Sequence, residues 1–477
     1  MEPSTVAALD RVAGWLPPGR RRTARTRSAH FPPGPALAPP AQLALWMLRP
    51  VAFLEHCRAR YGSTFTLRLP GFPPIVSFAD EAANRDVFTG PPEELYAGGA
   101  NASLRPILGP GSLLLLDGER HLRERRLLLP PFHGARLHAY GETIAAITRT
   151  EIARWRTDAP APVQPGTQEI TLDVILRTVF GMDEGPSMQH LRAAMLSLLD
   201  HASPVNMVPV LQRDLGPRSP WGKFLAHRAD VDALLYELIA TRRREGTAGH
   251  DDILSLLLDA RYEDGSVMSD RDLRDELMTL LAAGHETSAT ALAWAITWLA
   301  RTPSVQARAH EEVDRVLGGA APEGASAKAE LPYVDAVIKE TMRIDPVVYA
   351  VGRVLQKPRT IGGWDLPSGH AAILSIWLTH HDPVLWPEPG RFDPERFLSA
   401  SGGASGRGNR VTPYTYFPFG GGVRRCIGMQ FALYEMRIVL AEVLRRFRIE
   451  PAGEIRRVRR TVTMAPSDGA PVVLRRR

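Results

Sequence analysis

The fold is decided by the stretch Phe419-Gly420-Gly421-Gly422-Val423-Arg424-Arg425-Cys426-Ile427-Gly428. A cysteine closes this glycine-rich, doubly basic loop, and the apolar pattern over residues 429–447 predicts a buried helix directly after it. The amino end of that helix and the two arginines bring positive charge to the sulfur, which favours a thiolate. The glycines let the backbone pass close beneath a flat ligand. The loop therefore predicts a thiolate ligand to a metal centre; the alternative is a small core cysteine after a turn.

The pattern Phe-x-x-Gly-x-Arg-x-Cys-x-Gly resembles the haem-binding loop of the cytochromes P450. The resemblance runs from about Pro32 to the C-terminus. It implies a mainly α fold with small β-sheets, a triangular helical prism whose long central helix lies over the haem. It also implies haem b as the cofactor, with Cys426 as axial thiolate and metal ligand and with Phe419 and Gly428 beside the group.

A second motif lies inside a helix predicted over residues 270–302. Ser269 and Asp272 have the spacing of a helix start, and Pro303 marks the end. The middle of this helix reads Ala283-Gly284-His285-Glu286-Thr287-Ser288. A glycine there costs about 1 kcal/mol relative to alanine, so its presence needs a reason. The alternative is an ordinary helix with one polar stripe.

This hexapeptide resembles the oxygen-binding segment of the cytochromes P450, where the helix opens slightly over the haem. The resemblance places Ala283 and Gly284 against the cofactor. It assigns Thr287 to hold dioxygen and its water by hydrogen bonds. It assigns Glu286 to supply protons, the role of a general acid. His285 is interpreted as structural.

A third group of residues predicts a charge network. Glu340 and Arg343 are three residues apart, so they share one face of a helix and can pair. The segment Phe392-Asp393-Pro394-Glu395-Arg396-Phe397 resembles the family segment that donates a second arginine. The resemblance implies that Glu340, Arg343 and Arg396 brace the cysteine loop. We interpret all three as folding residues rather than catalysts.

A fourth motif, over residues 117–126, predicts a clamp for the haem propionates. His121 and Arg125 are four residues apart and lie on one helical face. The resemblance gives the propionate role to these two residues and to Arg353 and Arg424. A solvated arginine-rich surface is the alternative. The other arginines of the segment are expected at the surface, where with Arg425 they would form a basic patch for an acidic electron donor: Arg120, Arg123 and Arg126.

Substrate contacts follow from family position and are mostly apolar, which favours a greasy substrate. The predicted pocket residues are Leu280, Ala283, Val348, Tyr349 and Val462. The family often has proline in place of Tyr349, so the shape of the pocket is undetermined at that position. The motifs do not choose among fatty acids, terpenes, steroids and polyketides.

Composition limits the class of protein. The two cysteines exclude a disulfide framework and favour the cytoplasm. No signal peptide, transmembrane run or nucleic-acid module is visible. We expect one catalytic domain over 31–477 and a mobile basic tail over 1–30. That tail, with five arginines between residues 20 and 27, is either solvated or a weak contact to a membrane surface through apolar residues between 6 and 16.

Other elements are predicted from pattern alone. Residues 32–40 should be an extended proline-rich segment. A helix follows over 50–61, then a hairpin of strands 64–68 and 75–78. Further strands are expected at 371–376 and 472–474, and a second hairpin over 360–366 turns at two glycines. Cys57 is interpreted as a packing residue.

Together these features predict a monomeric haem-thiolate monooxygenase that inserts one atom of O₂ into an apolar substrate. No flavin reductase segment follows the motifs, so a ferredoxin-type donor with an NAD(P)H-dependent reductase is expected to supply electrons. Two alternatives stay open. One is a peroxide-driven peroxygenase or isomerase, although such relatives generally alter the acid–alcohol pair kept here as Glu286-Thr287. The other is a haem carrier or gas sensor, which should carry an output domain.

Overall fold

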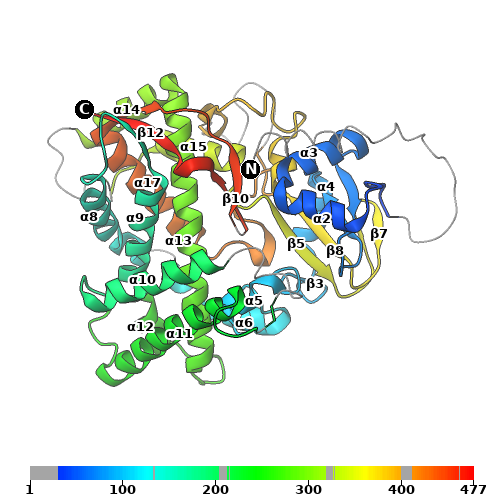
Figure 1. Cartoon of the computed structure of the whole chain (residues 1–477), viewed down its shortest axis with the longest axis horizontal. Helices are drawn as coiled ribbons and strands as arrows, with labels where there is room; N and C mark the ends of the chain where they lie inside the picture. Colours follow the sequence, from blue (N-terminus) through cyan, green and yellow to red (C-terminus); the bar gives the residue numbers. More distant parts are fainter. Residues whose placement is uncertain are drawn as a thin grey trace. The chain divides into compact units, whose positions relative to one another are not determined.

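The computed structural model describes residues 31–132, 135–202, 212–213, 215–318, 326, 328–398, 411–460 and 462–477. The described residues from Phe31 onward form one compact unit in which helices dominate. The strands form small separate sheets, the largest at the right of Figure 1 and another at its upper left. The predicted tail lies outside the described residues. None of the described helices combines the length and the apolar character that a bilayer crossing requires.

The α-helices are α2 (Pro39–Leu48), α3 (Pro50–Tyr61), α4 (Glu81–Phe88), α5 (Arg105–Leu108), α6 (Gly118–Leu128), α7 (Ala135–Ala139), α8 (Gly141–Ile152), α9 (Gln164–Thr178), α10 (Pro186–His201), α11 (Pro220–Glu245), α12 (Ile253–Asp259), α13 (Asp270–Arg301), α14 (Pro303–Leu317), α15 (Pro332–Ile344), α16 (Ile376–His380) and α17 (Met429–Arg446). The strands are β1 (Thr64–Leu67), β2 (Ile75–Phe78), β3 (Leu95–Tyr96), β4 (Pro160–Pro162), β5 (Ala350–Leu355), β6 (Arg359–Ile361), β7 (Trp364–Leu366), β8 (Ala371–Ser375), β9 (Phe447–Pro451), β10 (Arg457–Arg460), β11 (Thr463–Pro466) and β12 (Pro471–Arg476).

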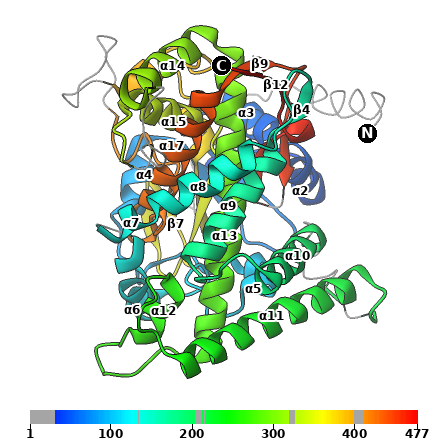
Figure 2. The ribbon, with the colours of Figure 1, turned by 90° about the vertical axis from the view of Figure 1, so that its left-hand side faces the viewer.

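Helix α13 is the column around which the helical side is built (Figures 1 and 2). It starts where the sequence predicted, because the Ser269 side chain accepts a hydrogen bond from the Asp272 backbone N–H. Its 32 residues continue as one helix through the 283–288 motif, without the opening that the resemblance implied. A Cβ on Gly284 would lie 2.9 Å from Ile175 Cδ1, so this glycine lets α9 approach closely. That contact supplies the reason that a mid-helix glycine needs.

Helix α17 confirms the prediction of a helix buried almost all round, packed against α8 and α13. Two carboxyl groups are buried on it. Glu442 accepts a hydrogen bond of 2.6 Å from Ser326 Oγ, and Arg149 Nη1 lies 3.7 Å from it. Glu435 is also fully buried, and its Oε1 has no hydrogen-bond partner among the described residues. Burial raises the pKa of Glu435 to about 8 against the opposing bond from Ser288, so this side chain is protonated at neutral pH.

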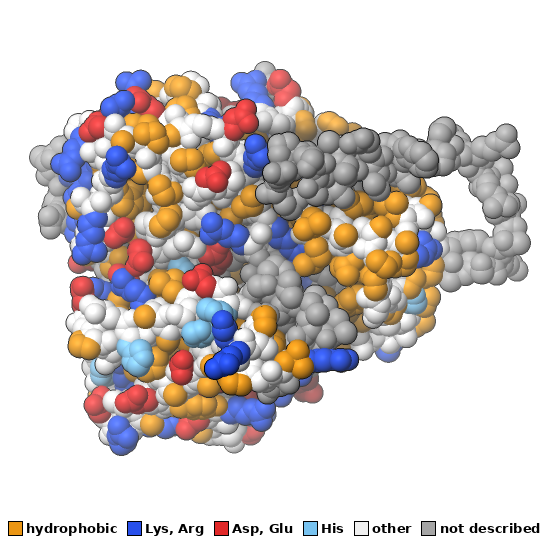
Figure 3. Space-filling view, viewed as in Figure 1, with side chains coloured by type: hydrophobic (Ala, Val, Ile, Leu, Met, Phe, Trp, Pro, Cys, Tyr) orange, Lys and Arg blue, Asp and Glu red, His pale blue; other side chains and the backbone are white. Residues whose placement is uncertain are grey.

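The largest sheet has the strand order β1-β2-β8-β5-β3. Strands β1 and β2 form the predicted antiparallel hairpin, and β2 pairs with β8 in parallel. The predicted hairpin β6–β7 is also present; Gly362 and Gly363 turn it with φ values of +54° and +79°, a conformation that suits glycine. The predicted strand 472–474 is the middle of β12, the central strand of the β4-β12-β9 sheet. Hydrophobic side chains gather on the surface over α2 and α3 (Figure 3).

The structure corrects one prediction near the start of the described chain. Residues 32–38 are extended as expected, but Pro39 and Pro40 are the first residues of α2 rather than the end of the extended segment. Proline is favoured at the first positions of a helix because its fixed φ suits a helix and its missing N–H is not needed there. Cys57 is buried among apolar side chains beneath α2, as predicted for a packing residue.

We expect Glu435→Gln to change the pH dependence of stability. The folded pKa of about 8 lies above the ordinary value of 4.5, so the unfolded chain releases this proton first as pH rises. The wild-type free energy of unfolding should therefore fall by about 1.4 kcal/mol per pH unit across this window, roughly 5 kcal/mol in total. Urea denaturation at pH 5 and pH 8 measures the change. The glutamine variant should lose this slope, and equal slopes in the two proteins would contradict the assignment.

Candidate functional site

Backbone contacts fix the shape of the cysteine loop. Cys426 N donates to Phe419 O at 2.9 Å, and Gly428 caps the start of α17. The thiol keeps accessible surface, yet burial raises its pKa, so the sulfur opens on a space deep inside the protein. The backbone N–H of Gly428 and the charges of Arg125 and Arg425 act in the opposite direction and lower that pKa. The loop thus supplies the donors that the sequence predicted for a thiolate, and a coordinated metal ion would remove the thiol proton outright.

The glycines of this loop serve a contact that the sequence did not indicate. A Cβ on Gly421 would lie 2.5 Å from Phe88 Cδ2, and one on Gly422 would overlap the Phe88 carbonyl oxygen. Gly422 also has a φ of +63°, which disfavours other residues. These two glycines therefore seat the loop on the end of α4, whereas we had expected all three glycines to face a flat ligand.

On α13, Ala283 is exposed in the middle of a largely buried helix, so it also opens on internal space. Thr287 Oγ1 donates to the Ala283 carbonyl oxygen at 2.6 Å. Ala283 on α13 and Cys426 at the end of the cysteine loop therefore both keep accessible surface. His285 points away into the core, where its ring contacts Thr171, as expected of a structural residue.

Glu286 faces α9. Its Oε2 accepts a hydrogen bond of 2.8 Å from Gln168 Nε2, and Thr290 Oγ1 lies 3.4 Å from its Oε1. Burial raises the pKa of Glu286, while the Gln168 bond and the charge of Arg460 lower it. The carboxyl group therefore keeps a proton to higher pH than a solvated glutamate does.

Positive groups converge beside the cysteine loop. His121 is buried on α6, and burial together with the charges of Arg424, Arg125 and Arg353 lowers its pKa to about 3. Burial and the charge of Arg424 lower the pKa of Arg353 to about 10. The one hydrogen bond found for the Arg353 guanidinium goes to the carbonyl of the adjacent Gly352, at 2.8 Å. Neither Arg125 nor Arg353 has a carboxylate within ion-pair distance among the described residues.

Asp117 is the functional residue that our reading of the sequence missed. Its carboxylate pairs with Arg424 and accepts hydrogen bonds of 2.9 Å from the backbone N–H groups of Ala97 and Gly98. Arg424 also donates to the carbonyl oxygens of Leu113 and Leu116. The position of Asp117 before a helix did not indicate this role, because its side chain makes no cap bond and turns instead to Arg424 and the backbone at residues 97 and 98. Arg424 is therefore engaged by the protein itself, unlike the free propionate clamp that we predicted.

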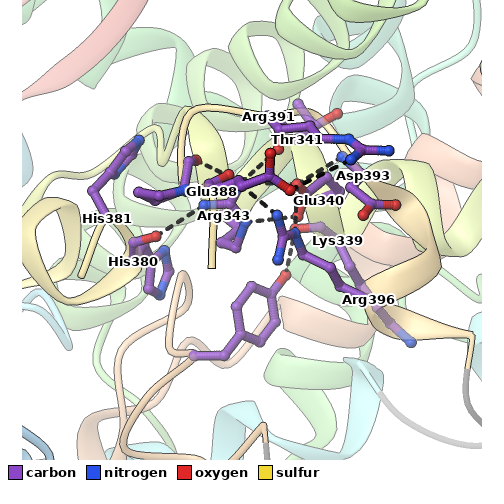
Figure 4. A network of polar contacts seen from close by, with 12 residues as sticks. Lys339, Glu340, Thr341, Arg343, His380, His381, Glu388, Arg391, Asp393 and Arg396 are labelled. Atoms are coloured by element: carbon purple, nitrogen blue, oxygen red, sulfur yellow. Dashed lines mark hydrogen bonds and ion pairs between the residues drawn. The ribbon is translucent and has the colours of Figure 1, made fainter. Parts of the chain in front are cut away.

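The charge network forms as predicted, deep between α15 and the segment around residue 393 (Figure 4). Arg343 Nε and Nη2 donate to the two oxygens of Glu340 at 2.7 and 2.8 Å, and both side chains are fully buried. Arg396 Nε lies 3.5 Å from Glu340 Oε1, and Asp393 N donates to the same oxygen at 2.9 Å. Removing one partner of such a buried pair costs roughly 3–5 kcal/mol, because a charge is left uncompensated.

A histidine connects this network to the cysteine loop. Arg343 Nη1 donates to the His380 carbonyl oxygen at 2.9 Å, and the His380 Nε2 accepts from Phe417 N at 3.1 Å. Burial and the charge of Arg343 lower the pKa of His380 well below its ordinary value, which keeps the ring neutral and Nε2 able to accept. Phe417 O in turn accepts from Gly420 N at 2.9 Å. The network therefore reaches the glycine loop from Arg343 through three hydrogen bonds.

The predicted pocket residues are not all brought together. Leu280 lies on α13 close to Ala283 and is partly buried. The backbone bond from Met464 N to Val347 O, at 2.8 Å, puts the segments of Val348 and Val462 side by side. Tyr349 lies elsewhere: its side chain is buried beneath α2, with its ring 5.6 Å from that of Trp46. This placement argues against Tyr349 as a pocket residue.

The predicted basic patch is largely neutralised. Three of its arginines are exposed as expected, but each pairs with a carboxylate at 2.6–3.0 Å: Arg120 with Asp272, Arg123 with Asp264 and Arg126 with Glu263. The acidic partners come from α13 and from the loop before it, whose proximity the local sequence did not reveal. Arg425 is also exposed.

Comparisons with known proteins identify relatives of the whole described unit. A family model described as Cytochrome P450 matches residues 32–470. Cytochrome P450 135B1 of Mycobacterium bovis, named for its family and not for a reaction, is 40% identical over 454 residues, which is 94% of this chain and 92% of that protein. Cytochrome P450 138 of the same organism is 40% identical over 423 residues, 88% of this chain and 90% of its own length.

Two solved structures have the same fold. A cyanobacterial CYP120A1 with bound retinoic acid aligns with a TM-score of 0.80 at 27% identity, covering 94% of this chain and 100% of that one. The haem domain of cytochrome P450DA aligns with a TM-score of 0.79 at 25% identity, covering 94% and 96% of the two chains. Both the predicted family and the predicted fold class are confirmed.

The residues of the site fit the prosthetic group of this family, haem b held by a cysteine thiolate. Arg125, Arg353 and Arg424 carry three positive charges, and Asp117 offsets one of them. The two charges left over equal those of the two propionates of haem b. Arg353 is buried and Arg125 half-buried, and a buried positive charge without a carboxylate partner is unfavourable, so an anionic group would stabilise the site. The accessible thiol of Cys426 would supply the metal ligand.

We expect Arg353→Leu to weaken haem binding without destabilising the apoprotein. The substitution removes a buried charge that has no protein partner but would pair with a propionate, a contact worth about 2 kcal/mol. Haem affinity should therefore fall roughly thirtyfold, measured by transfer of haem to apomyoglobin. The exposed Arg123, changed to leucine, is the matched control and should transfer haem at the wild-type rate. Equal rates for wild type and Arg353→Leu would remove Arg353 from the clamp.

Proposed function

The chain belongs to the cytochrome P450 family, and we propose on that premise that it inserts one atom of O₂ into an apolar, lipid-like substrate with electrons from a separate donor protein. The family supports haem-thiolate monooxygenase activity in general, together with O₂, a substrate and a redox partner. The observation that carries the proposal is the accessible thiol of Cys426 beside the charges of Arg125 and Arg425. The Thr287 hydroxyl and the Glu286 carboxyl on α13 add the polar groups that the reaction needs.

We assign the catalytic domain to residues 31–477, which contain every residue proposed for the site, and keep the basic tail over 1–30 as a separate element. Both cysteines are unpaired thiols, which suits the reducing cytoplasm that we propose as the location. We propose that the protein acts as a monomer.

Cys426 would be the thiolate that holds the haem iron, because the other cysteine cannot serve. Cys57 has no accessible surface, and burial in an apolar cluster raises its pKa to about 12. When bound, haem supplies the redox chemistry that splits O₂. The protein would hold the sulfur with the Gly428 N–H and the charge of Arg125, and would hold the propionates with His121, Arg125 and Arg353. The haem would also contact the two ends of the cysteine loop, at Phe419 and Gly428. On its other face it would contact α13, at Ala283 and Gly284.

Proton delivery is assigned to Glu286 and Thr287. Burial raises the pKa of Glu286, so this carboxyl keeps its proton to higher pH than a solvated glutamate does, which favours the role of general acid. Its bond to Gln168 fixes the carboxyl toward α9, so it must leave Gln168 before it can donate toward Thr287. The Thr287 hydroxyl, which donates to Ala283 O, is the group closest in sequence that can relay the proton.

The proposed substrate is an apolar molecule of lipid type. Support comes from the apolar residues Leu280, Ala283 and Val348, and from the retinoic acid bound to the cyanobacterial relative. Val462, in the turn between β10 and β11, remains a proposed contact at the edge. A ferredoxin with an NAD(P)H-dependent reductase is the proposed electron source; its support is the family, because most of the expected basic patch is already paired.

Cys426→Ala should abolish the red-shifted band of the ferrous carbon monoxide complex, because that band reports thiolate ligation. The measurement is a reduced difference spectrum of the purified protein. Cys57→Ala is the matched control and should keep the band. Its survival in Cys426→Ala would mean that the ligand is misassigned.

Thr287→Ala should keep haem and the carbon monoxide band, but it should divert electrons from product to hydrogen peroxide. Without the hydroxyl, we expect product per NADPH to fall about tenfold or more and hydrogen peroxide to rise, since proton transfer by a positioned group is worth about 10²–10⁴-fold. Thr297→Ala is the control, because Thr297 makes the same hydroxyl bond four residues back, to Ala293 O at 2.8 Å. An unchanged product yield in Thr287→Ala would exclude the relay. Turnover with hydrogen peroxide alone, at the full rate, would instead favour a peroxygenase.

A further inference from the structure

Helix α17 carries a buried carboxyl group that no step of the proposed reaction uses. Glu435 bonds to Ser288, the residue that directly follows Thr287 on α13, and α17 packs against that helix (Figures 1 and 2). Its Oε1 has no hydrogen-bond partner among the described residues. Nine residues separate Glu435 from Cys426, so it lies roughly 10–15 Å along the helix from the sulfur. Glu435 is therefore buried between the helix that follows the cysteine loop and the helix of the 283–288 motif.

No charged side chain among the described residues compensates Glu435. Burial and the Ser288 bond are the two influences on its pKa. The titratable groups buried on the neighbouring helices are engaged elsewhere: Arg149 of α8 with Glu442, Glu312 of α14 with the backbone N–H groups of residues 333 and 334, Glu340 of α15 with Arg343, and on α13 Glu286 with Gln168 and His285 with Thr171. A buried carboxyl group without a counter-charge responds strongly to a new charge in its surroundings.

We propose that Glu435 is the proton acceptor coupled to reduction of the haem: as one electron converts ferric to ferrous iron, its carboxylate takes up one proton from solvent and becomes a carboxylic acid. The electron adds one negative charge to the buried region and the proton removes one, so the net charge of that region is unchanged. By linkage, the proton raises the affinity for the electron by the same factor as the electron raises the affinity for the proton. At roughly 10–15 Å and an effective dielectric constant of about 20, this factor is roughly tenfold.

The folded pKa of about 8 sets the pH range in which the coupling is visible. At pH 7 Glu435 is already protonated before the electron arrives, so reduction takes up almost no proton. At pH 9 the oxidised protein holds a carboxylate, and the electron enters against one more negative charge. The affinity for the electron should therefore fall as pH rises through this range. This coupling rests on the haem of the family and not on the proposed substrate or donor.

The test is a spectroelectrochemical titration of the haem-containing protein with small-molecule mediators, which needs neither substrate nor donor protein. Wild type and Glu435→Gln should be reduced equally well at pH 7, because glutamine is neutral like the protonated acid. At pH 9 the equilibrium constant for reduction of the wild type should be about fivefold below that of the variant. Glu450→Gln, at a surface carboxylate of β9 that pairs with Arg475, is the matched control and should follow the wild type at both pH values.

Reduced-minus-oxidised infrared difference spectra give a second readout, which the wild type supplies even if the variant does not take up haem. At pH 9 reduction of the wild type should produce the carbonyl stretch of a new carboxylic acid, and Glu435→Gln should lack that band. The proposal is overturned if the wild type shows no such band, or if the band remains in the variant. It is also overturned if the two proteins lose affinity for the electron equally between pH 7 and pH 9.

Discussion

A buried surplus of positive charge beside one sulfur is the constraint on which this structure depends. Arg125, Arg353 and Arg424 meet at His121, and Asp117 is the one carboxylate paired with them among the described residues. Desolvation lowers the pKa of each arginine, a direct sign that burial works against their charge. Folding alone does not relieve this cost. A dianionic ligand would relieve it, and for this reason we propose that these residues belong to the cofactor site.

The rest of the site fixes the position of the cysteine loop relative to these arginines. Asp117 joins Arg424 of the cysteine loop to the backbone at residues 97 and 98, while Arg125 donates to the Arg425 carbonyl oxygen at 2.7 Å. From the other side, the Glu340–Arg343 pair acts through His380 on the backbone at Phe417. The loop is thus held by two polar systems that share no residue. Each uses buried charge, which is costly when incomplete, and so each favours one geometry over its alternatives.

Interactions between residues close in the sequence could be predicted from the sequence. The helix cap at Ser269, the i, i+3 pair of Glu340 and Arg343 and the two-glycine turn at residue 362 follow from spacing alone, and the structure shows all three. Contacts between distant segments could not be predicted in this way. Three features depend on which distant segments meet in space. Arg120 pairs with Asp272, Gly421 packs against Phe88, and Tyr349 is buried beneath α2. Family position supplied the site residues, but not the carboxylate that holds Arg424.

The seat of the cysteine loop on α4 has a consequence for how the protein is made. Asn84 of that helix donates to the Tyr414 carbonyl oxygen at 2.8 Å across 330 residues, and the Phe88 contact with Gly422 spans a similar length of chain. During synthesis α4 is therefore made long before residues 414–422, which contact it in the folded protein. Closure of such distant contacts is slow. The cysteine loop therefore reaches its final position only after most of the chain has been synthesised, and capture of haem by Cys426 must be a late event in biogenesis.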